Sequence, residues 1–205
     1  MNIDMESVFF SYKDIPIIQN LNYRFEDGIY LIRGKSGIGK TTILNLIIGY
    51  IQPITGNIKR ENAKIEYMMQ ETMLFNNLTV KENLFIKHSL STVIDKDSFD
   101  KLISTKLHEI GLDTDIVEKK VSYLSGGQKR KLELVLISLN DANVILMDEP
   151  IANLDEESVE QIVYYIEKNL MNNKIVIISS HSKMKFTCNV KNIALENYTL
   201  QNKAM

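Results

Sequence analysis

The chain has 205 residues, of which 44% are hydrophobic and 24% charged, and this is enough apolar surface for one globular unit with a buried core. Its 24 Lys and Arg residues nearly balance its 26 Asp and Glu residues, so the formal net charge of −2 does not favour a nucleic-acid surface. The single cysteine, Cys188, excludes an internal disulfide and a cysteine-based metal cluster. We interpret Cys188 as a packing residue.

Neither a secretion signal nor a membrane span is expected. Residues 1–10 carry acidic side chains where a signal peptide needs a basic start and an apolar run. The most apolar stretch, residues 43–51, is interrupted by an asparagine and a glycine and is about half of the ~20 residues that a spanning helix requires.

The amino-terminal residues predict β structure. Residues 21–25 alternate between apolar and polar side chains before a turn at Asp27-Gly28, which indicates antiparallel strands. Residues 29–32 then form a continuous apolar run, which is typical of a strand buried on both faces.

Two helical regions follow. Apolar residues recur at helical spacing over 40–51, and we expect Pro53 and Gly56 to end this helix. Residues 71–123 carry helical periodicity without β runs, with a stop at Gly111, so we interpret them as a small helical lobe.

The remaining chain alternates between helices and strands. The pattern predicts a helix from about Gly126, a strand over 144–147, a helix over 159–170 and a strand over 175–178. This alternation indicates a parallel core sheet and therefore an α/β fold. The tail, residues 189–205, is expected to add short edge strands.

A glycine-rich loop lies between the buried strand and the first helix and fits the pattern G-x-x-x-x-G-K-[ST]. Its backbone N–H groups and the positive end of the helix favour a polyphosphate ligand. Lys40 would reach the β- and γ-phosphates of a nucleotide, and Thr41 would offer its hydroxyl to Mg²⁺. The residues that we expect to surround the phosphates are Gly34, Lys35, Ser36, Gly37, Ile38, Gly39, Lys40, Thr41 and Thr42.

A second anion-binding helix start is predicted at residues 124–128, which read Leu-Ser-Gly-Gly-Gln. The Ser125 hydroxyl and the N–H groups of Gly126 and Gly127 precede a helical stretch, and Gln128 completes the motif. Since the glycine-rich loop already surrounds one triphosphate, this site has no ligand of its own within one chain.

The Leu-Ser-Gly-Gly-Gln sequence resembles the signature motif of the ATP-binding-cassette (ABC) ATPases, and the resemblance covers nearly the whole chain. Residues 144–149 look like the family's Walker B strand, 152–155 are similar to its D-loop, and 74–84 resemble its LF-x-x-LTV-x-ENL stretch. The resemblance implies a P-loop NTPase fold over residues 1–205, a single nucleotide-binding domain with a mainly parallel core sheet, an amino-terminal antiparallel β subdomain and an inserted helical lobe.

The same resemblance implies the catalytic residues. Asp148 would support Mg²⁺, and Glu149 would orient or deprotonate the attacking water. Gln70 matches the Q-loop glutamine and His181 the switch histidine, and these two would sense the metal and the γ-phosphate. The alternatives are that Asp148, Glu149 and Pro150 form a solvated strand end or a cap for the following helix, and that His181 is structural.

Other nucleotide contacts are implied in the same way. Tyr12 fits the aromatic residue that stacks on adenine, although it could instead face the core or a cross-strand neighbour. Asp155 of the D-loop is counted with the nucleotide-binding residues. The residues expected near Mg²⁺ are Thr41, Gln70 and Asp148.

Some positions depart from the family pattern. Leu136 stands where an arginine often falls, which leaves contacts from that helix in doubt. Ile151 replaces a common threonine or serine, and Ser182 replaces a common aspartate. We interpret the run at 129–131 as a solvated helix face, with a phosphate or partner contact as the alternative.

The resemblance also implies partners. ABC cassettes act in head-to-tail pairs, so a homodimer or a heterodimer with another cassette is expected. The leading hypothesis is an ATP-hydrolysing transporter subunit that binds separate transmembrane permease subunits and is cytoplasmic, at the inner face of the cell membrane, with no nucleic-acid partner. The alternatives are a soluble ABC ATPase acting on DNA or ribosomes and a low-turnover nucleotide-gated regulator. The transported substrate and its direction are not encoded in a cassette of this kind.

Overall fold

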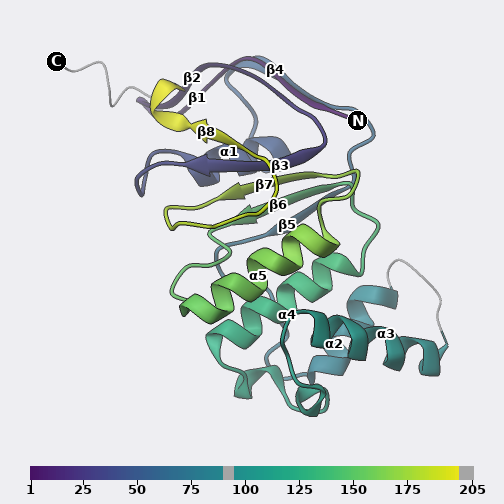
Figure 1. The fold of residues 1–205 in the computed structure, drawn as a ribbon. Helices are drawn as coiled ribbons and strands as arrows, with labels where there is room; N and C mark the ends of the chain where they lie inside the picture. Colours follow the sequence, from purple (N-terminus) through teal and green to yellow (C-terminus); the bar gives the residue numbers. More distant parts are fainter. Residues whose placement is uncertain (90–94, 199–205) are drawn as a thin grey trace.

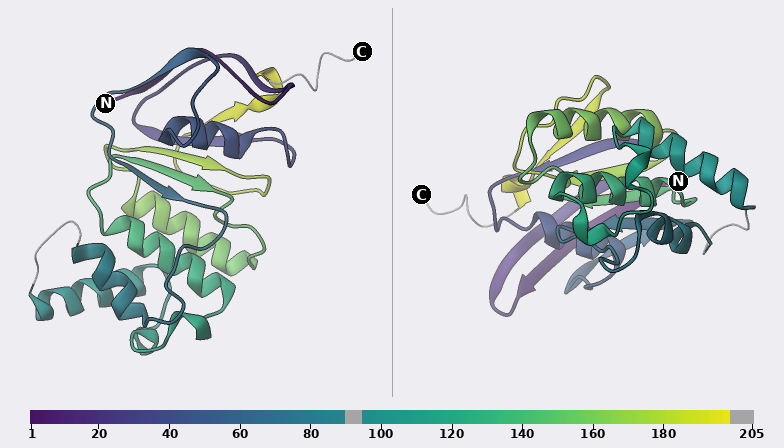
Figure 2. Two further views of the ribbon diagram at one scale, coloured as in Figure 1. Left: turned by 180° about the vertical axis from the view of Figure 1, so that it is seen from behind. Right: turned by 90° about the horizontal axis from the view of Figure 1, so that it is seen from below.

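A computed structural model describes residues 1–89 and 95–198 of the chain. Its two β-sheets and its helices are stacked in layers (Figure 1). The antiparallel sheet lies at one end, helix α1 separates it from the parallel sheet, and helices α4 and α5 cover the opposite face of the parallel sheet. Helices α2 and α3 lie beyond α4 (Figure 2). The layered arrangement confirms the predicted α/β class.

The first sheet has the strand order β2-β1-β4, with β1 at Ile3–Tyr12, β2 at Ile15–Phe25 and β4 at Thr55–Arg60. Both pairings are antiparallel, and the β1–β2 pairing runs from Ile3 opposite Phe25 to Tyr12 opposite Ile15, with register shifts between Met5 and Ser11. The antiparallel prediction for this part of the chain is therefore confirmed.

The second sheet is parallel throughout and has the order β5-β6-β7-β3-β8. Every residue of β6 and β7 is buried, because helices cover both faces, and this explains their continuous apolar sequences. The strands are β3 at Gly28–Arg33, β5 at Ile65–Met68, β6 at Val144–Asp148, β7 at Ile175–Ser179 and β8 at Val190–Ala194.

The helices bury two apolar cores against this sheet. One core lies between the two sheets around α1, and the other lies between the parallel sheet and the remaining helices. No helix in 1–89 or 95–198 is long and apolar enough to cross a membrane. The helices are α1 at Lys40–Ile48, α2 at Val80–Ser89, α3 at Lys96–Glu109, α4 at Gly126–Ser138 and α5 at Glu156–Asn169, with 3₁₀ turns at Thr114–Ile116, Val121–Tyr123 and Leu195–Tyr198.

The predicted end of the first helix was wrong. Helix α1 ends at Ile48, because Gly49 takes a left-handed conformation with φ of 90° and its N–H donates to the Asn45 carbonyl at 3.1 Å. This is a glycine cap of the usual kind. Pro53 and Gly56 lie beyond it and do not end the helix.

Two predictions extend past the described residues. Within 71–123, the described part holds α2, α3 and two 3₁₀ turns, while residues 90–94 lie outside the description. The limits of the helical lobe stay a prediction. In the tail, β8 pairs with β3 at the edge of the parallel sheet, as expected, and residues 199–205 lie outside the description. Cys188 packs against the apolar core, as expected.

Candidate nucleotide-binding site

The glycine-rich loop leaves β3 at its carboxyl end and leads directly into α1. Gly39 is the residue before the helix and has φ of 112°, a conformation that other residues rarely adopt. A Cβ atom on Gly39 would lie 2.6 Å from the Ile17 Cγ2 atom of β2. The loop therefore needs glycine here for its backbone angle and for its close approach to β2.

We expect Gly39→Ala to destabilise the folded chain by about 1–3 kcal/mol, since the residue is strained at positive φ and must also displace Ile17. For a chain of this size, each kcal/mol lowers the thermal midpoint by roughly 2–4 °C. Thermal unfolding measures this. The matched control is Gly126→Ala, where an added Cβ meets no heavy atom within 4 Å. Equal midpoints for the two variants would contradict the assignment.

The Lys40 side chain is held against the loop. Its Nζ atom donates to the carbonyl oxygens of Gly34, at 2.9 Å, and Lys35, at 3.3 Å. It also lies 3.3 Å from the Glu149 Oε1 atom, and both side chains are buried. The ammonium group is therefore fixed above the helix start, where an anion would be bound.

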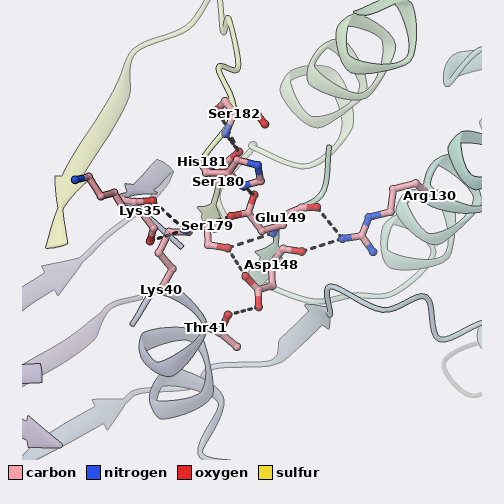
Figure 3. Close-up of polar contacts among 11 residues, drawn as sticks. Lys35, Lys40, Thr41, Arg130, Asp148, Glu149, Ser179, Ser180, His181 and Ser182 are labelled. Atoms are coloured by element: carbon pink, nitrogen blue, oxygen red, sulfur yellow. Dashed lines mark hydrogen bonds and ion pairs between the residues drawn. The ribbon is translucent and has the colours of Figure 1, made fainter. Parts of the chain in front are cut away.

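Asp148 lies at the carboxyl end of β6 and is joined to the loop (Figure 3). The Thr41 hydroxyl donates to Asp148 Oδ2 at 2.7 Å, and the Ser179 hydroxyl donates to Asp148 Oδ1. Hydroxyl and carboxylate oxygens are suitable donors for Mg²⁺, which usually takes few protein ligands and shares the rest with phosphates and water. The described residues contain no cluster of three or more His, Cys, Asp or Glu side chains that could hold a metal ion.

Glu149 follows Asp148 in a strained, buried turn. Its φ is 49°, although it is not a glycine, and its N–H donates to the Ser179 carbonyl at 3.0 Å. Its Oε2 atom lies 2.8 Å from His181 Nδ1 and accepts the His181 backbone N–H at 3.2 Å. Backbone strain that the surrounding structure maintains is concentrated at functional sites. The contacts bring Glu149, His181 and Lys40 together.

These side chains surround one cavity of about 530 Å³, within the size range of ligand pockets. Tyr12 lies at the rim of this cavity and is 49% exposed. Its ring packs edge-on against the ring of Phe10, with the two ring centroids 4.9 Å apart. Gln70 lies on the cavity wall after β5. The cavity is lined by Tyr12, Ile17, Ser36, Gly37, Gly39, Lys40, Thr41, Thr42, Gln70, Glu149 and His181.

Other predicted residues lie elsewhere. The Ile38 side chain is buried in the core between the sheets. Ser125 caps α4 through a reciprocal pair of hydrogen bonds with Gln128, and neither residue lines the cavity; Gly126 lines a neighbouring one. Asp155 caps α5 by accepting the Ser158 N–H at 2.8 Å. The nucleotide roles of these residues stay predictions.

The interpretation of residues 129–131 as a solvated face was wrong for two of the three. Arg130 and Lys131 are 5% and 8% exposed, because this part of α4 packs against other elements. Lys131 donates to the Gln161 side chain, and Arg130 donates to several backbone carbonyls. Sequence reasoning missed Arg130. A signal was present in Glu133, three residues later, since this spacing places an ion pair on one helix face.

The fold and this cavity define a P-loop nucleotide-binding cassette, since a glycine loop, an acidic strand end and a following histidine meet at one edge of a parallel sheet. The family model described as ABC transporter matches residues 18–152, more than half of the chain. The chain belongs to the ABC transporter family and is one of its ATP-binding cassettes. The resemblance inferred from the sequence is thereby confirmed.

Individual relatives agree with this assignment. The ABC transporter ATP-binding protein YfmM of Bacillus subtilis (strain 168) is 34% identical over 73% of this chain and 28% of the relative, so the chain spans less than a third of that protein. The thiamine import ATP-binding protein ThiQ of Haemophilus influenzae (strain 86-028NP) is 33% identical over 81% of this chain and 80% of its own length. A structure from Pyrococcus furiosus, named for an ABC transporter ATP-binding protein, is 26% identical with a TM-score of 0.83, covering 97% of this chain and all of its own.

Proposed function

We propose that this chain binds and hydrolyses ATP as the cassette subunit of an ABC transporter, pairs with a second cassette when ATP is bound, and drives separate membrane-spanning subunits. The observation that carries the proposal is the cavity lined by Lys40, Thr41, Glu149 and His181, with Asp148 held directly behind it by the Thr41 hydroxyl. A cation, two oxygen ligands and a carboxylate match the groups that hold the phosphates, the metal and the attacking water in phosphoryl transfer, and the imidazole of His181 lies beside that carboxylate.

Each group then has a task. ATP supplies the γ-phosphoryl group and Mg²⁺ neutralises its oxygens when they are bound. Lys40 binds the phosphates, while Thr41 and Asp148 present oxygens to the metal or to its water ligands. Tyr12 stacks on the adenine from the rim of the cavity.

Glu149 is the general base. It is buried beside His181, so it can orient a water molecule and accept its proton as the water attacks. Lys40 and His181 both contact the Glu149 carboxylate. A γ-phosphate that attracts Lys40 would leave Glu149 free to contact water. Gln70, on the cavity wall, contacts the metal or the attacking water.

The second cassette completes the site. The start of α4 is a helix end suited to an anion and is formed by Ser125, Gly126, Gly127 and Gln128. None of these residues lines the phosphate-loop cavity, so they have no triphosphate to bind within one chain. We place them on ATP held by the partner cassette.

The permease surface lies near the Gln70 loop and α2. Met73, Phe75, Phe85 and Tyr123 are large apolar side chains that are exposed in this region. The segments that carry Phe75 and Tyr123 adjoin, since the Ser122 N–H donates to the Asn76 carbonyl at 3.0 Å. Exposed apolar groups of this kind mark interaction sites. The cassette would be held at the inner face of the membrane by this contact.

A disulfide crosslink tests the composite site. In a Cys188→Ser background, cysteines at Ser36 and Ser125 should form a covalent dimer between chains with MgATP or a non-hydrolysable analogue, and not without nucleotide. The readout is non-reducing electrophoresis. The matched control pairs Ser36→Cys with a cysteine at Ser104, an exposed serine of α3, and should not crosslink. A crosslink within one chain only, or one that forms without nucleotide, would contradict the proposal that the two cassettes share a composite site.

A further inference from the structure

Arg130 is buried in α4, the helix that begins at the Leu-Ser-Gly-Gly-Gln motif and is called the signature helix below. Figure 3 shows its side chain directed toward Asp148 and Glu149. Arg130 lies just over one turn into α4, four residues after Gly126. Its guanidinium donates to the backbone carbonyls of Asp148 at 2.8 Å, Glu149 at 3.2 Å and Pro150 at 3.2 Å. These are the consecutive residues of the turn that carries the catalytic carboxylates. One side chain therefore holds the whole turn.

The Arg130 side chain also contacts the segment before Gln70, and Glu133, its ion-pair partner, contacts the segment after Gln70. Arg130 Nη1 donates to the Met69 carbonyl at 2.7 Å and lies 3.0 Å from Glu133 Oε2. The other carboxylate oxygen of Glu133 accepts the Met73 N–H at 2.8 Å. The Arg130–Glu133 pair thus holds the chain on both sides of Gln70.

These contacts depend on the shape and charge of both side chains. A guanidinium presents five N–H donors in a rigid plane, while a lysine ammonium is a point charge that cannot reach carbonyls on both segments. A buried cation needs a partner, and Glu133 supplies it. Burial raises the pKa of Glu133, while the Met73 N–H and the Arg130 charge act in the opposite direction. The pair is therefore interdependent.

The Glu149 backbone has particular need of such support. Its φ of 49° is unfavourable for a glutamate and persists only when neighbouring groups constrain it. The Ser179 carbonyl binds its N–H from β7, and Arg130 binds its carbonyl from α4. The orientation of this carboxylate is therefore set from the sheet and from the signature helix together.

We propose that Arg130 and Glu133 are positioning residues that fix Glu149 and Gln70 relative to the signature helix, so that a displacement of α4 changes the catalytic turn and the Gln70 loop together. Arg130 is the single arginine of α4. Leu136, the position where an arginine often falls in the family, packs against the apolar core. The catalytic consequence rests on the proposed ATPase function, while the structural coupling does not.

Hydrogen exchange followed by mass spectrometry tests the coupling independently of activity. Arg130→Lys keeps the charge but loses the planar donor set, so amides in both 69–73 and 148–153 should exchange several-fold faster than in the wild type, while 40–48 in α1 should be unchanged. Glu133→Gln should loosen 69–73 more than 148–153. The control, Lys129→Gln, changes the neighbouring, partly exposed side chain and should alter neither segment. Unchanged exchange in either segment of Arg130→Lys would overturn the proposal.

Kinetics then tests the consequence. Arg130→Lys should lower kcat by about 10- to 100-fold while the Kd for MgATP stays within about threefold, since the groups that bind phosphate are untouched. In a Glu149→Gln background the same change should cause a smaller loss than in the wild type, because the part of the effect that acts through Glu149 is already lost and only the part through Gln70 remains. A kcat equal to that of the wild type, or a full additive loss in the double variant, would overturn the positioning role. A wild-type chain with no ATPase activity alone or with its membrane partner would instead overturn the proposed function, and hydrogen exchange would still decide the coupling.

Discussion

Lys40→Ala should lower the affinity for MgATP by about 100-fold and abolish turnover. Hydrogen bonds to charged groups contribute about 1.5–3 kcal/mol each, and each 1.4 kcal/mol is a tenfold change in the dissociation constant. The Lys40 ammonium is buried and held by the loop carbonyls of Gly34 and Lys35, so its orientation toward a bound phosphate is already set. Titration calorimetry with MgATP measures the change.

The matched control for this prediction is Lys101→Ala. Lys101 lies on α3, is exposed and does not line the cavity. This substitution removes the same charge while leaving Lys40 in place, and we expect affinity within about threefold of the wild type, as for exposed charges in general. Wild-type affinity in Lys40→Ala, measured beside this control, would refute the phosphate-loop assignment.

Glu149→Gln should slow hydrolysis by about 10²–10⁴-fold, the usual contribution of a general base, while ATP binding is retained. Glutamine keeps the shape of the buried side chain beside His181 but cannot accept the proton of the attacking water. ATP should therefore persist in the site, and the chain should accumulate as an ATP-bound dimer. Size exclusion with and without MgATP measures the dimer, and phosphate release measures turnover.

Glu156→Gln provides the control for the loss of one carboxylate. Glu156 lies in the exposed first turn of α5 and does not line the cavity. Its removal should leave both hydrolysis and the dimer population unchanged. Undiminished hydrolysis by Glu149→Gln would show that another residue acts as the base. If the isolated cassette dimerises weakly, both measurements need the membrane partner, since mass action sets the dimer population.

Local features of the site were predictable because short segments specify them. The strand, glycine loop and helix around Gly39 follow from residue spacing and from the conformational freedom of glycine. The start of α4 at Gly126 was equally predictable, because Ser125 and Gln128 satisfy the helix end through their own side chains. Such motifs require few contacts with distant residues.

The end of α1 shows how local competition limits prediction. Gly49 can cap a helix, but Pro53 and Gly56 are stronger helix-stop signals, so the predicted end of the helix lay further along the chain. A residue in the left-handed conformation ends a helix as soon as its N–H finds a free carbonyl, here that of Asn45. Which of several stop signals acts first depends on how the following chain is led to β4.

By itself, the sequence determined that this chain has a parallel α/β core, a glycine-rich loop that leads into the helix starting at Lys40, and the order of the motifs up to His181. Only the tertiary structure decided that Arg130 is buried and joins the turn at Glu149 to the Gln70 loop, and that Ser179 supports Asp148. The physical reason is range. A motif is specified by neighbours a few residues away, whereas the surroundings of Arg130 are carbonyls about 20 and 60 positions distant, which periodicity and propensity do not encode.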